Sequence, residues 1–216
     1  MKVDVKIPDT LSEITLGQYQ KYIKIQEQNE DENFIALKML EIFCGLKGQT
    51  VLNMKTKSIK EITDVLVKMF SEKPPLVREF KMNGVNYGFI PNLEDMTFGE
   101  YIDLDTFVGK TEDLHKAMGV LYRPITHKRK ELYWIQKYKG EDTNLMKDMP
   151  MHAVFSAMLF FYHLGTDLSR VMLNYLEQDN EENIAQQLIS LENGDGINRF
   201  KDSLREILQD LKISLN

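Results

Sequence analysis

One sequence pattern occurs twice in the chain, as Ile7-Pro8-Asp9-Thr10-Leu11-Ser12-Glu13-Ile14-Thr15-Leu16-Gly17-Gln18-Tyr19 and as Ile90-Pro91-Asn92-Leu93-Glu94-Asp95-Met96-Thr97-Phe98-Gly99-Glu100-Tyr101. Each copy predicts a helix start, because Thr15 or Thr97 can act as N-cap while Gln18 or Glu100, three residues later, completes a capping box. The flanking apolar residues, Ile14 with Tyr19 and Met96 with Tyr101, have hydrophobic-staple spacing. The internal repeat 7–19/90–101 therefore predicts two helices that begin alike, through duplication or as a recurrent solution, and we assign these residues a structural role rather than a ligand.

Strand signals precede both copies. Apolar residues alternate with polar ones at Val3, Val5 and Ile7, and again at Val85, Tyr87 and Phe89. Asn83-Gly84 between two such runs is a strong hairpin signature, because both turn positions need positive φ. We predict a β-hairpin at 76–90, and a second one that joins 121–126 to 132–138 around the basic tip 127–130.

Two stretches predict amphipathic helices. The first has an apolar stripe that stops at Gly45: Phe34, Leu37, Leu40 and Cys44. The second opens with a further capping box, Ser58 with Glu61, and cannot continue through Pro74-Pro75. Its inward-facing residues are expected to be Ile62, Val65, Leu66 and Met69.

The stretch 151–164 is apolar on nearly every face, so we predict the central core helix there. Pro150 is expected to start it and Gly165 to end it, with a shorter helix following to Leu176. It has about 14 residues, whereas a helix that crosses a membrane needs roughly 20, so no membrane contact is expected. Together these signals predict a mainly α fold with small antiparallel β elements (α+β), in which a helical core carries one or two β-hairpins.

The acidic residues are concentrated at the C-terminal end. Residues 167–216 hold ten acids and five bases, a net charge of −5 out of −6 for the whole chain. We divide the chain into a mainly helical globular domain, 1–176, and an acidic helical extension, 177–216. The extension ends in an amphipathic helix that packs on its own domain or docks on a partner, with a seam of Ile197, Phe200, Leu204, Ile207 and Leu211.

Basic residues gather in the stretch 110–139, which holds eight Lys/Arg against three acids. A basic strip and an acidic end on one molecule favour head-to-tail association with copies of itself or with a partner, or they are two ordinary solvated faces. In this strip, cations alternate with aromatic rings, as in platforms for single-stranded nucleic acid. Because the net charge is negative and no nucleic-acid module is present, we favour protein contact through the predicted hairpin tip, with Lys128, Arg129 and Lys130 as the binding residues.

Composition and motifs exclude several classes of protein. The 216 residues include one cysteine, Cys44, so an internal disulfide framework or multi-cysteine zinc site is excluded. The chain contains no H-x-x-x-H pair, phosphate-binding glycine loop or serine-hydrolase elbow. No signal peptide is recognisable, so synthesis in a reducing cytoplasm is expected. We therefore predict a protein that is not an enzyme and has no cofactor or metal.

Three segments carry a family resemblance: 89–105, 118–125 and 160–165. They resemble an uncharacterised virion-morphogenesis protein family of tailed Bacteroidetes phages, including crAss-like phages. The strand followed by a capped helix start is also similar to tail assembly chaperones of tailed phages. The resemblance supplies no catalytic residues.

The resemblance implies a non-enzymatic phage structural or morphogenesis protein that is made in the host cytoplasm and carried in the virion. Its partners would be other phage structural proteins at the portal, the head–tail connector or the tail, and it could form a homo-oligomer. One alternative is an assembly chaperone that is absent from the mature virion. Another is a phage nucleic-acid-binding factor, although nucleic acid is the less expected partner.

Overall fold

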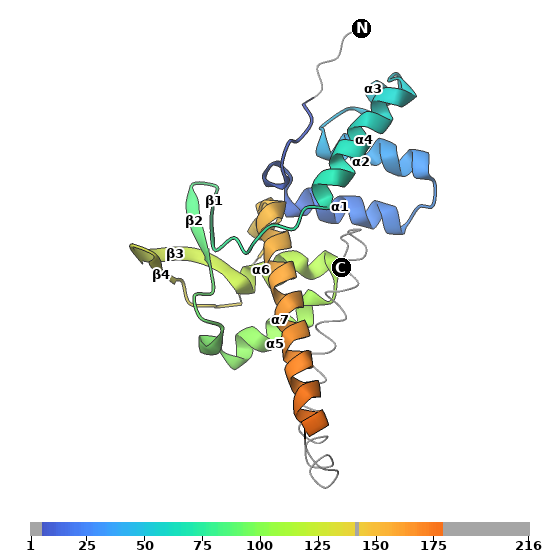
Figure 1. Cartoon of the computed structure of the whole chain (residues 1–216). Helices are drawn as coiled ribbons and strands as arrows, with labels where there is room; N and C mark the ends of the chain where they lie inside the picture. The colour runs from blue at the N-terminus through green and yellow to red at the C-terminus, as the bar shows by residue number, and fades with distance from the viewer. Residues whose placement is uncertain (1–5, 141–142, 179–216) are drawn as a thin grey trace.

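The computed structural model describes residues 6–140 and 143–178, and it shows a mainly α fold with a small antiparallel sheet (Figure 1). The α-helices of this part are α1 (Leu16–Glu27), α2 (Glu32–Phe43), α3 (Gly48–Leu52), α4 (Thr56–Phe70), α5 (Phe98–Val108), α6 (Leu114–Leu121) and α7 (Met151–Gln178). The strands are β1 (Glu79–Met82), β2 (Val85–Phe89), β3 (Tyr122–Arg129) and β4 (Leu132–Ile135). Short 3-10 turns are η1 (Leu11–Glu13), η2 (Leu93–Asp95), η3 (Thr111–Asp113) and η4 (Asn144–Asp148).

Both repeat copies start helices as predicted. Thr15 caps α1 and Thr97 caps α5, and in each case the side chain three residues later accepts from the backbone N–H of the cap. The distance from the Thr15 N–H to Gln18 Oε1 is 2.9 Å, and from the Thr97 N–H to Glu100 Oε2 it is 2.6 Å. The two capping boxes are therefore confirmed.

The predicted capping box at Ser58 and Glu61 is wrong. Helix α4 begins two residues earlier, at Thr56, and its N-cap is Lys55, which makes no side-chain cap. The backbone N–H of Ser58 already donates to the Lys55 carbonyl at 2.9 Å, so Ser58 lies inside the first turn. Val65, predicted to face inward, is exposed on α4.

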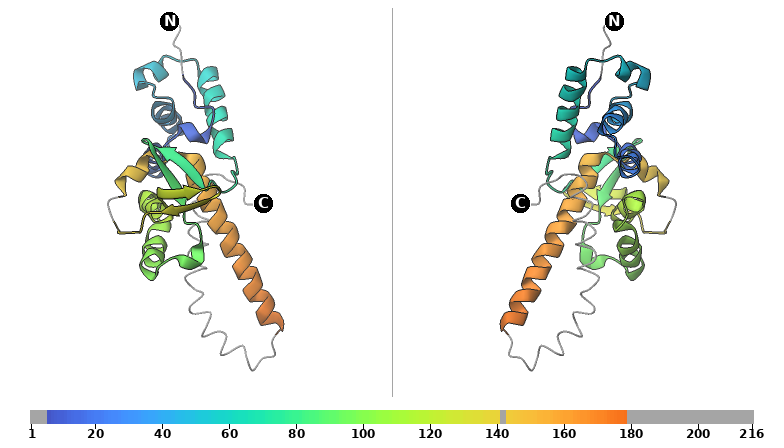
Figure 2. Two further views of the ribbon diagram at one scale, coloured as in Figure 1. Left: turned by 90° about the vertical axis from the view of Figure 1, so that its left-hand side faces the viewer. Right: turned by 90° about the vertical axis from the view of Figure 1, so that its right-hand side faces the viewer.

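Helix α7 joins the helical and sheet parts of the core. Residues 151–162 are buried except for the half-buried His152 and Phe160, and Phe155 packs edge-to-face with the Tyr19 ring from α1 at a centroid distance of 5.9 Å. On the sheet side, Phe160 meets Phe89 of β2 at 5.7 Å. The far end of α7 projects beyond the other described elements (Figures 1 and 2).

The prediction that Gly165 ends this helix is wrong, because α7 runs through it without a break to Gln178. Glycine costs a helix roughly 1 kcal/mol, which tertiary packing readily overrides, and Gly165 is buried here. Among the residues that the structure describes, no helix is both long enough and apolar enough to span a membrane.

The four strands of the described part form one antiparallel sheet in the order β1-β2-β3-β4. The turn between β1 and β2 is Asn83-Gly84, and both residues have positive φ (49° and 81°), which confirms the hairpin at 76–90 with shorter strands. Ile7 is not part of a strand, and Val3 and Val5 lie outside the described residues. The second predicted hairpin also forms, as β3 and β4.

The start of α1 is covered by the start of α7. The Leu16 N–H donates to the Met149 carbonyl at 2.8 Å, and the Met151 N–H donates to the Ile14 carbonyl at 2.9 Å. These two bonds form an isolated antiparallel bridge between Thr15 and Pro150. The bridge holds the N-terminal ends of α1 and α7 together. Residues 149–151, which are far from α1 in the sequence, thus shield the N-terminal end of α1 from solvent.

Candidate interaction surface

The β3–β4 hairpin has two faces that its strand register separates. Lys128 pairs with Tyr133, whereas His127 pairs with Trp134 and Arg129 pairs with Leu132. Successive side chains of a strand point to opposite sides, so these pairs fall on opposite faces. We call the side of Lys128 and Tyr133 the inner face. The outer face consists of His127, Arg129, Leu132 and Trp134.

The inner face anchors the hairpin to the rest of the sheet. The Tyr133 hydroxyl donates to the Phe89 carbonyl at 2.8 Å, and its ring lies over Gly88. A Cβ atom at Gly88 would lie 2.5 Å from the Tyr133 ring, so only glycine allows this approach. Lys128 Nζ lies 2.7 Å from the Glu79 carboxylate of β1. The inner face is therefore structural.

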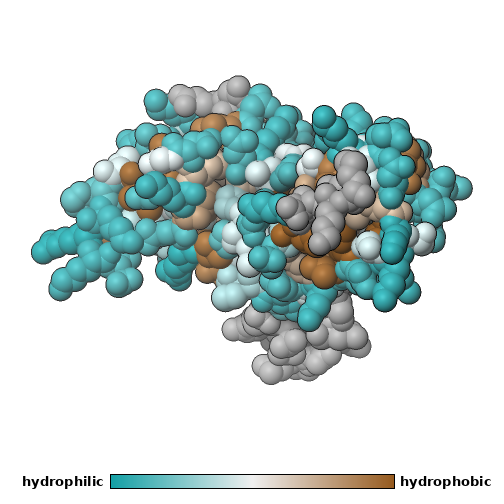
Figure 3. Space-filling model, turned by 90° about the horizontal axis from the view of Figure 1, so that it is seen from above, coloured by the Kyte–Doolittle hydropathy of each residue, from teal (hydrophilic) through white to brown (hydrophobic). Residues whose placement is uncertain are grey.

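The outer face is exposed to solvent. Leu132 is 67% exposed and Trp134 is 51% exposed, and the Trp134 ring lies 5.3 Å from the His127 ring between centroids. Arg129 is exposed, and no ion pair within the described residues includes it. The end of the molecule that carries this hairpin is covered mainly by hydrophilic residues when seen from above (Figure 3). Trp and Arg are the residues most enriched at the energetic centres of protein interfaces.

The predicted tip of His127-Lys128-Arg129-Lys130 needs a correction. Strand β3 extends to Arg129, and the turn is Lys130-Glu131, with Lys130 at φ 56°. The basic triplet is thus divided: Lys128 forms a surface ion pair with Glu79 of β1, whereas no ion pair among the described residues includes Arg129 or Lys130. The other predicted partner-binding residues lie outside the described residues: Ile197, Phe200, Leu204, Ile207 and Leu211.

The basic strip 110–139 is not one surface either. Arg123 lies at the base of β3 and forms a buried ion pair with Glu100 of α5, with 2.5 Å between Nη1 and Oε1. Lys116 pairs with Asp113 at 2.7 Å. Sequence reasoning missed the Glu100–Arg123 pair, since its partners belong to elements that only the tertiary fold brings together.

The environment of Glu100 keeps it ionised. Burial by itself would raise the pKa of this carboxyl, but hydrogen bonds from the Thr97 backbone and hydroxyl and the Arg123 charge outweigh burial and lower the pKa. Next to this pair, the Tyr138 hydroxyl donates to Asp103 Oδ2 at 2.7 Å, which ties the chain after β4 to α5. The hairpin therefore projects from a base that is fixed at both ends.

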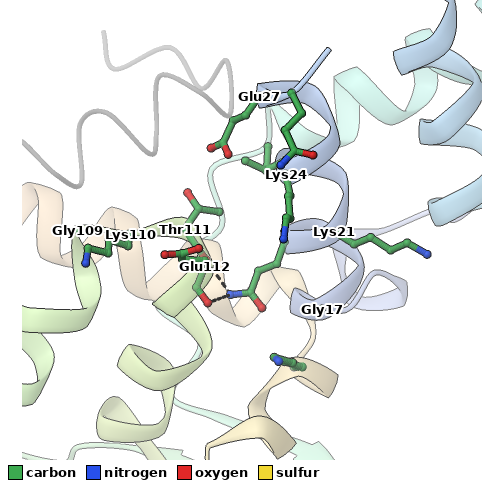
Figure 4. Close-up of a pocket in the computed structure, with 12 residues that line it drawn as sticks. Gly17, Lys21, Lys24, Glu27, Gly109, Lys110, Thr111 and Glu112 are labelled. Carbon is green, nitrogen blue, oxygen red and sulfur yellow. Dashed lines mark hydrogen bonds between the residues drawn. The ribbon is translucent and has the colours of Figure 1, made fainter.

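A groove of about 740 Å³ lies between α1 and η3 (Figure 4). One of its lining residues is Gln20 of α1, whose amide donates to the Thr111 carbonyl at 2.7 Å and to the Glu112 carbonyl at 3.0 Å. Lysine and glutamate side chains line its rim, and Lys21 points away from η3 in Figure 4. The hydrogen bonds of Gln20 join two elements, so we assign this groove a structural role.

Burial shifts the pKa of several titratable side chains outside the hairpin. Burial lowers the pKa of His115 and of His152, and burial raises the pKa of the Cys44 thiol, which weakens it as a nucleophile. In the described ranges, no group of three or more His, Cys, Asp and Glu side chains could hold a metal ion.

Comparison with known proteins gives no match to any family model, to any curated protein or to any solved structure. Two sequence signals pointed to the candidate surface: the basic run 127–130, and the alternation Leu132-Tyr133-Trp134, which separates an inner aromatic ring from two outer apolar side chains.

Proposed function

We propose that this protein works by binding another protein through the outer face of the β3–β4 hairpin, as a non-enzymatic structural component of a tailed phage near the head–tail connector or in the tail. The observation that carries the proposal is the exposure of Leu132 and Trp134 beside Arg129 on a hairpin whose other face is anchored. A rigid element with exposed aromatic, aliphatic and guanidinium groups loses little entropy when it binds. The phage assignment is supported by the family resemblance of segments 89–105, 118–125 and 160–165.

Nucleic acid receives less support as the ligand of this hairpin. A single-strand platform needs free cations beside its aromatic rings. Among the described residues, Lys128 is paired with Glu79 and Arg123 with Glu100, so on β3 and its turn only Arg129 and Lys130 are left without an ion pair. Of the two aromatic residues on β4 only Trp134 is exposed, so the hairpin offers one ring and two cations rather than a row of them.

Site-specific photo-crosslinking in infected cells tests the proposal. A photoreactive amino acid replaces Trp134, and the matched control carries it at Lys60, which is exposed on α4. We expect Trp134, but not Lys60, to cross-link to a structural protein in purified virions, either a portal, connector or tail protein or a second copy of this chain.

Three other results would contradict the proposal in different ways. An adduct found only in lysate, with the protein missing from virions by mass spectrometry, would identify an assembly chaperone instead. Salt-sensitive DNA binding that is lost when Lys128, Arg129 and Lys130 become alanine would identify a nucleic-acid factor. Equal cross-linking from both positions would show that the hairpin is not the contact surface.

A further inference from the structure

Helix α5 leaves one of its faces uncovered. Phe98 is 77% exposed, and Tyr101 and Ile102 are each 46% exposed. Residues three and four positions apart lie on one side of a helix, so these three side chains form one apolar patch, which we call the open α5 face. Exposed apolar patches of this kind mark contact sites more often than singly scattered residues do.

The first repeat copy shows how such a helix start is normally covered. Leu16 stands where Phe98 stands in the second copy, and it is fully buried. The Leu16 N–H is bonded to the Met149 carbonyl, and a Cβ at Gly17 would lie 3.2 Å from Lys147. At the equivalent Gly99, nothing lies within 4 Å of the Cβ position. The same kind of helix start is thus covered by another part of the chain in α1, whereas no described part of the chain covers it in α5.

Acidic side chains border the open α5 face. Glu94 and Asp95 lie in η2 just before the helix, and Asp105 lies one turn beyond Ile102 on the same side. All three are exposed, and no ion pair within the described residues includes them. The apolar side chains of this face are therefore followed by one acid on the same side of the helix and preceded by two acids in the turn before it.

The outer face of the β3–β4 hairpin is its complement, because the apolar Leu132 and Trp134 lie there with the cation Arg129, and Lys130 follows in the adjoining turn. We propose that the hairpin of one copy of this chain docks on the open α5 face of a second copy. Complementary charge orients such a contact and buried aromatic residues hold it. The proposal rests on the proposed function for the hairpin and names its partner as a second copy of this chain.

A contact between two different patches is heterologous. Repeated from copy to copy, it closes into a ring or continues as an open filament, unless two copies satisfy both contacts reciprocally. Each copy carries one hairpin and one open α5 face, so either patch can be disabled while the other is kept.

A complementation experiment tests the contact with the full-length chain. The hairpin variant carries Leu132→Ser and Trp134→Ser, the α5 variant carries Phe98→Ser and Ile102→Ser, and the control carries Leu52→Ser, another exposed leucine on α3. Their molar masses are measured by size-exclusion chromatography with light scattering over a range of concentrations, after circular dichroism has confirmed that each variant folds.

We expect the wild type and the control to self-associate alike above the 25.2 kDa monomer. Each double variant should lose affinity for itself by at least about tenfold. An equimolar mixture of the two should form a one-to-one dimer, because one intact hairpin and one intact α5 face remain. Unchanged association of either variant, or a mixture that stays monomeric, would overturn the proposal.

Disulfide trapping gives a second, independent measurement. In a Cys44→Ser background, one chain carries Lys130→Cys and the other carries Asp105→Cys, and mild oxidation should give the mixed dimer in preference to either homodimer. Random collision would give all three dimers in statistical proportion, which would contradict the proposed contact. If Trp134 cross-links to a different virion protein while these mixtures remain monomeric, the proposed function stands and the self-contact falls.

Discussion

Helices α1 and α5 begin with the same capping chemistry but occupy different surroundings. In α1, the residues after the N-cap are in the core: Leu16 and Tyr19 are buried. In α5, the matching Phe98 and Tyr101 are exposed. A capping box therefore sets where a helix begins, whereas the chain that crosses over it sets which of its faces is free to bind.

The last residue of each capping box, three positions after the threonine, differs between the two helices in the same way. Gln18 closes its box and also donates from its amide to the Ile42 carbonyl of α2 at 2.8 Å. Glu100 closes its box and pairs with Arg123 of β3. The neutral residue ties one helix to another, whereas the charged residue neutralises a buried cation at the base of the hairpin.

The largest effect is expected from Glu100→Gln. Glutamine keeps the capping box, as Gln18 does in α1, but it leaves the Arg123 guanidinium buried without a counter-charge. Breaking a buried pair in this way should lower the free energy of unfolding by about 4 kcal/mol, as measured by urea denaturation at pH 7. Adding Arg123→Met should recover part of the loss. If the single variant is as stable as the wild type, the ion pair does not stabilise the hairpin base.

The next largest effect comes from comparing one alanine substitution at the start of α1 with the equivalent substitution at the start of α5. Leu16→Ala removes a fully buried side chain and should cost about 3 kcal/mol in unfolding free energy. Phe98→Ala, at the equivalent position of α5, should change it by less than about 0.5 kcal/mol in dilute protein, because the ring is mostly exposed. Similar losses at both positions would mean that the open α5 face is covered within the same chain.

The two equivalent glycines should respond with opposite signs. Gly99→Ala places a methyl group in open space within a helix and should stabilise the protein by about 0.5 kcal/mol. Gly17→Ala pushes a methyl group against the Lys147 backbone and should destabilise it by about 1 kcal/mol. The stability changes of both variants are measured by thermal unfolding. A gain in stability from Gly17→Ala would show that Lys147 is not tightly packed against α1.

Local signals were enough to predict part of this fold. Asn83-Gly84 and the two threonine capping boxes were correct because a turn and a helix start depend on a few adjacent residues. The Ser58–Glu61 pattern failed because serine followed by glutamate also occurs inside a helix, and there the backbone of Lys55 begins the helix. Gly165 failed as a helix end because packing outweighs the intrinsic cost of a glycine.

The candidate surface was only half predictable. The alternation of side chains along β4 predicted that Tyr133 and Trp134 lie on opposite faces of the hairpin. Nothing near Lys128 in the sequence indicated that it would form an ion pair with Glu79. The sequence did not reveal the open α5 face, because two similar motifs predict that both helix starts are buried to a similar extent. The difference arises from residues 149–151, which cover α1 and come more than 130 positions later in the chain.

The smallest effect is expected from pH, and it sharpens the comparison of Gln18 with Glu100. The pKa of Glu100 is below its ordinary value of 4.5 in the folded protein, so its ionised form stabilises the fold above that pH. As pH falls through the folded pKa, the carboxylate takes up a proton and this contribution is lost. Stability differences between wild type and Glu100→Gln should therefore shrink below pH 4.5, as followed by urea denaturation. Burial also lowers the pKa of His115 and of His152, but it does so in both proteins, so their protonation cancels in the difference. A difference that stays constant with pH would show that the charge of Glu100 does not stabilise the hairpin base.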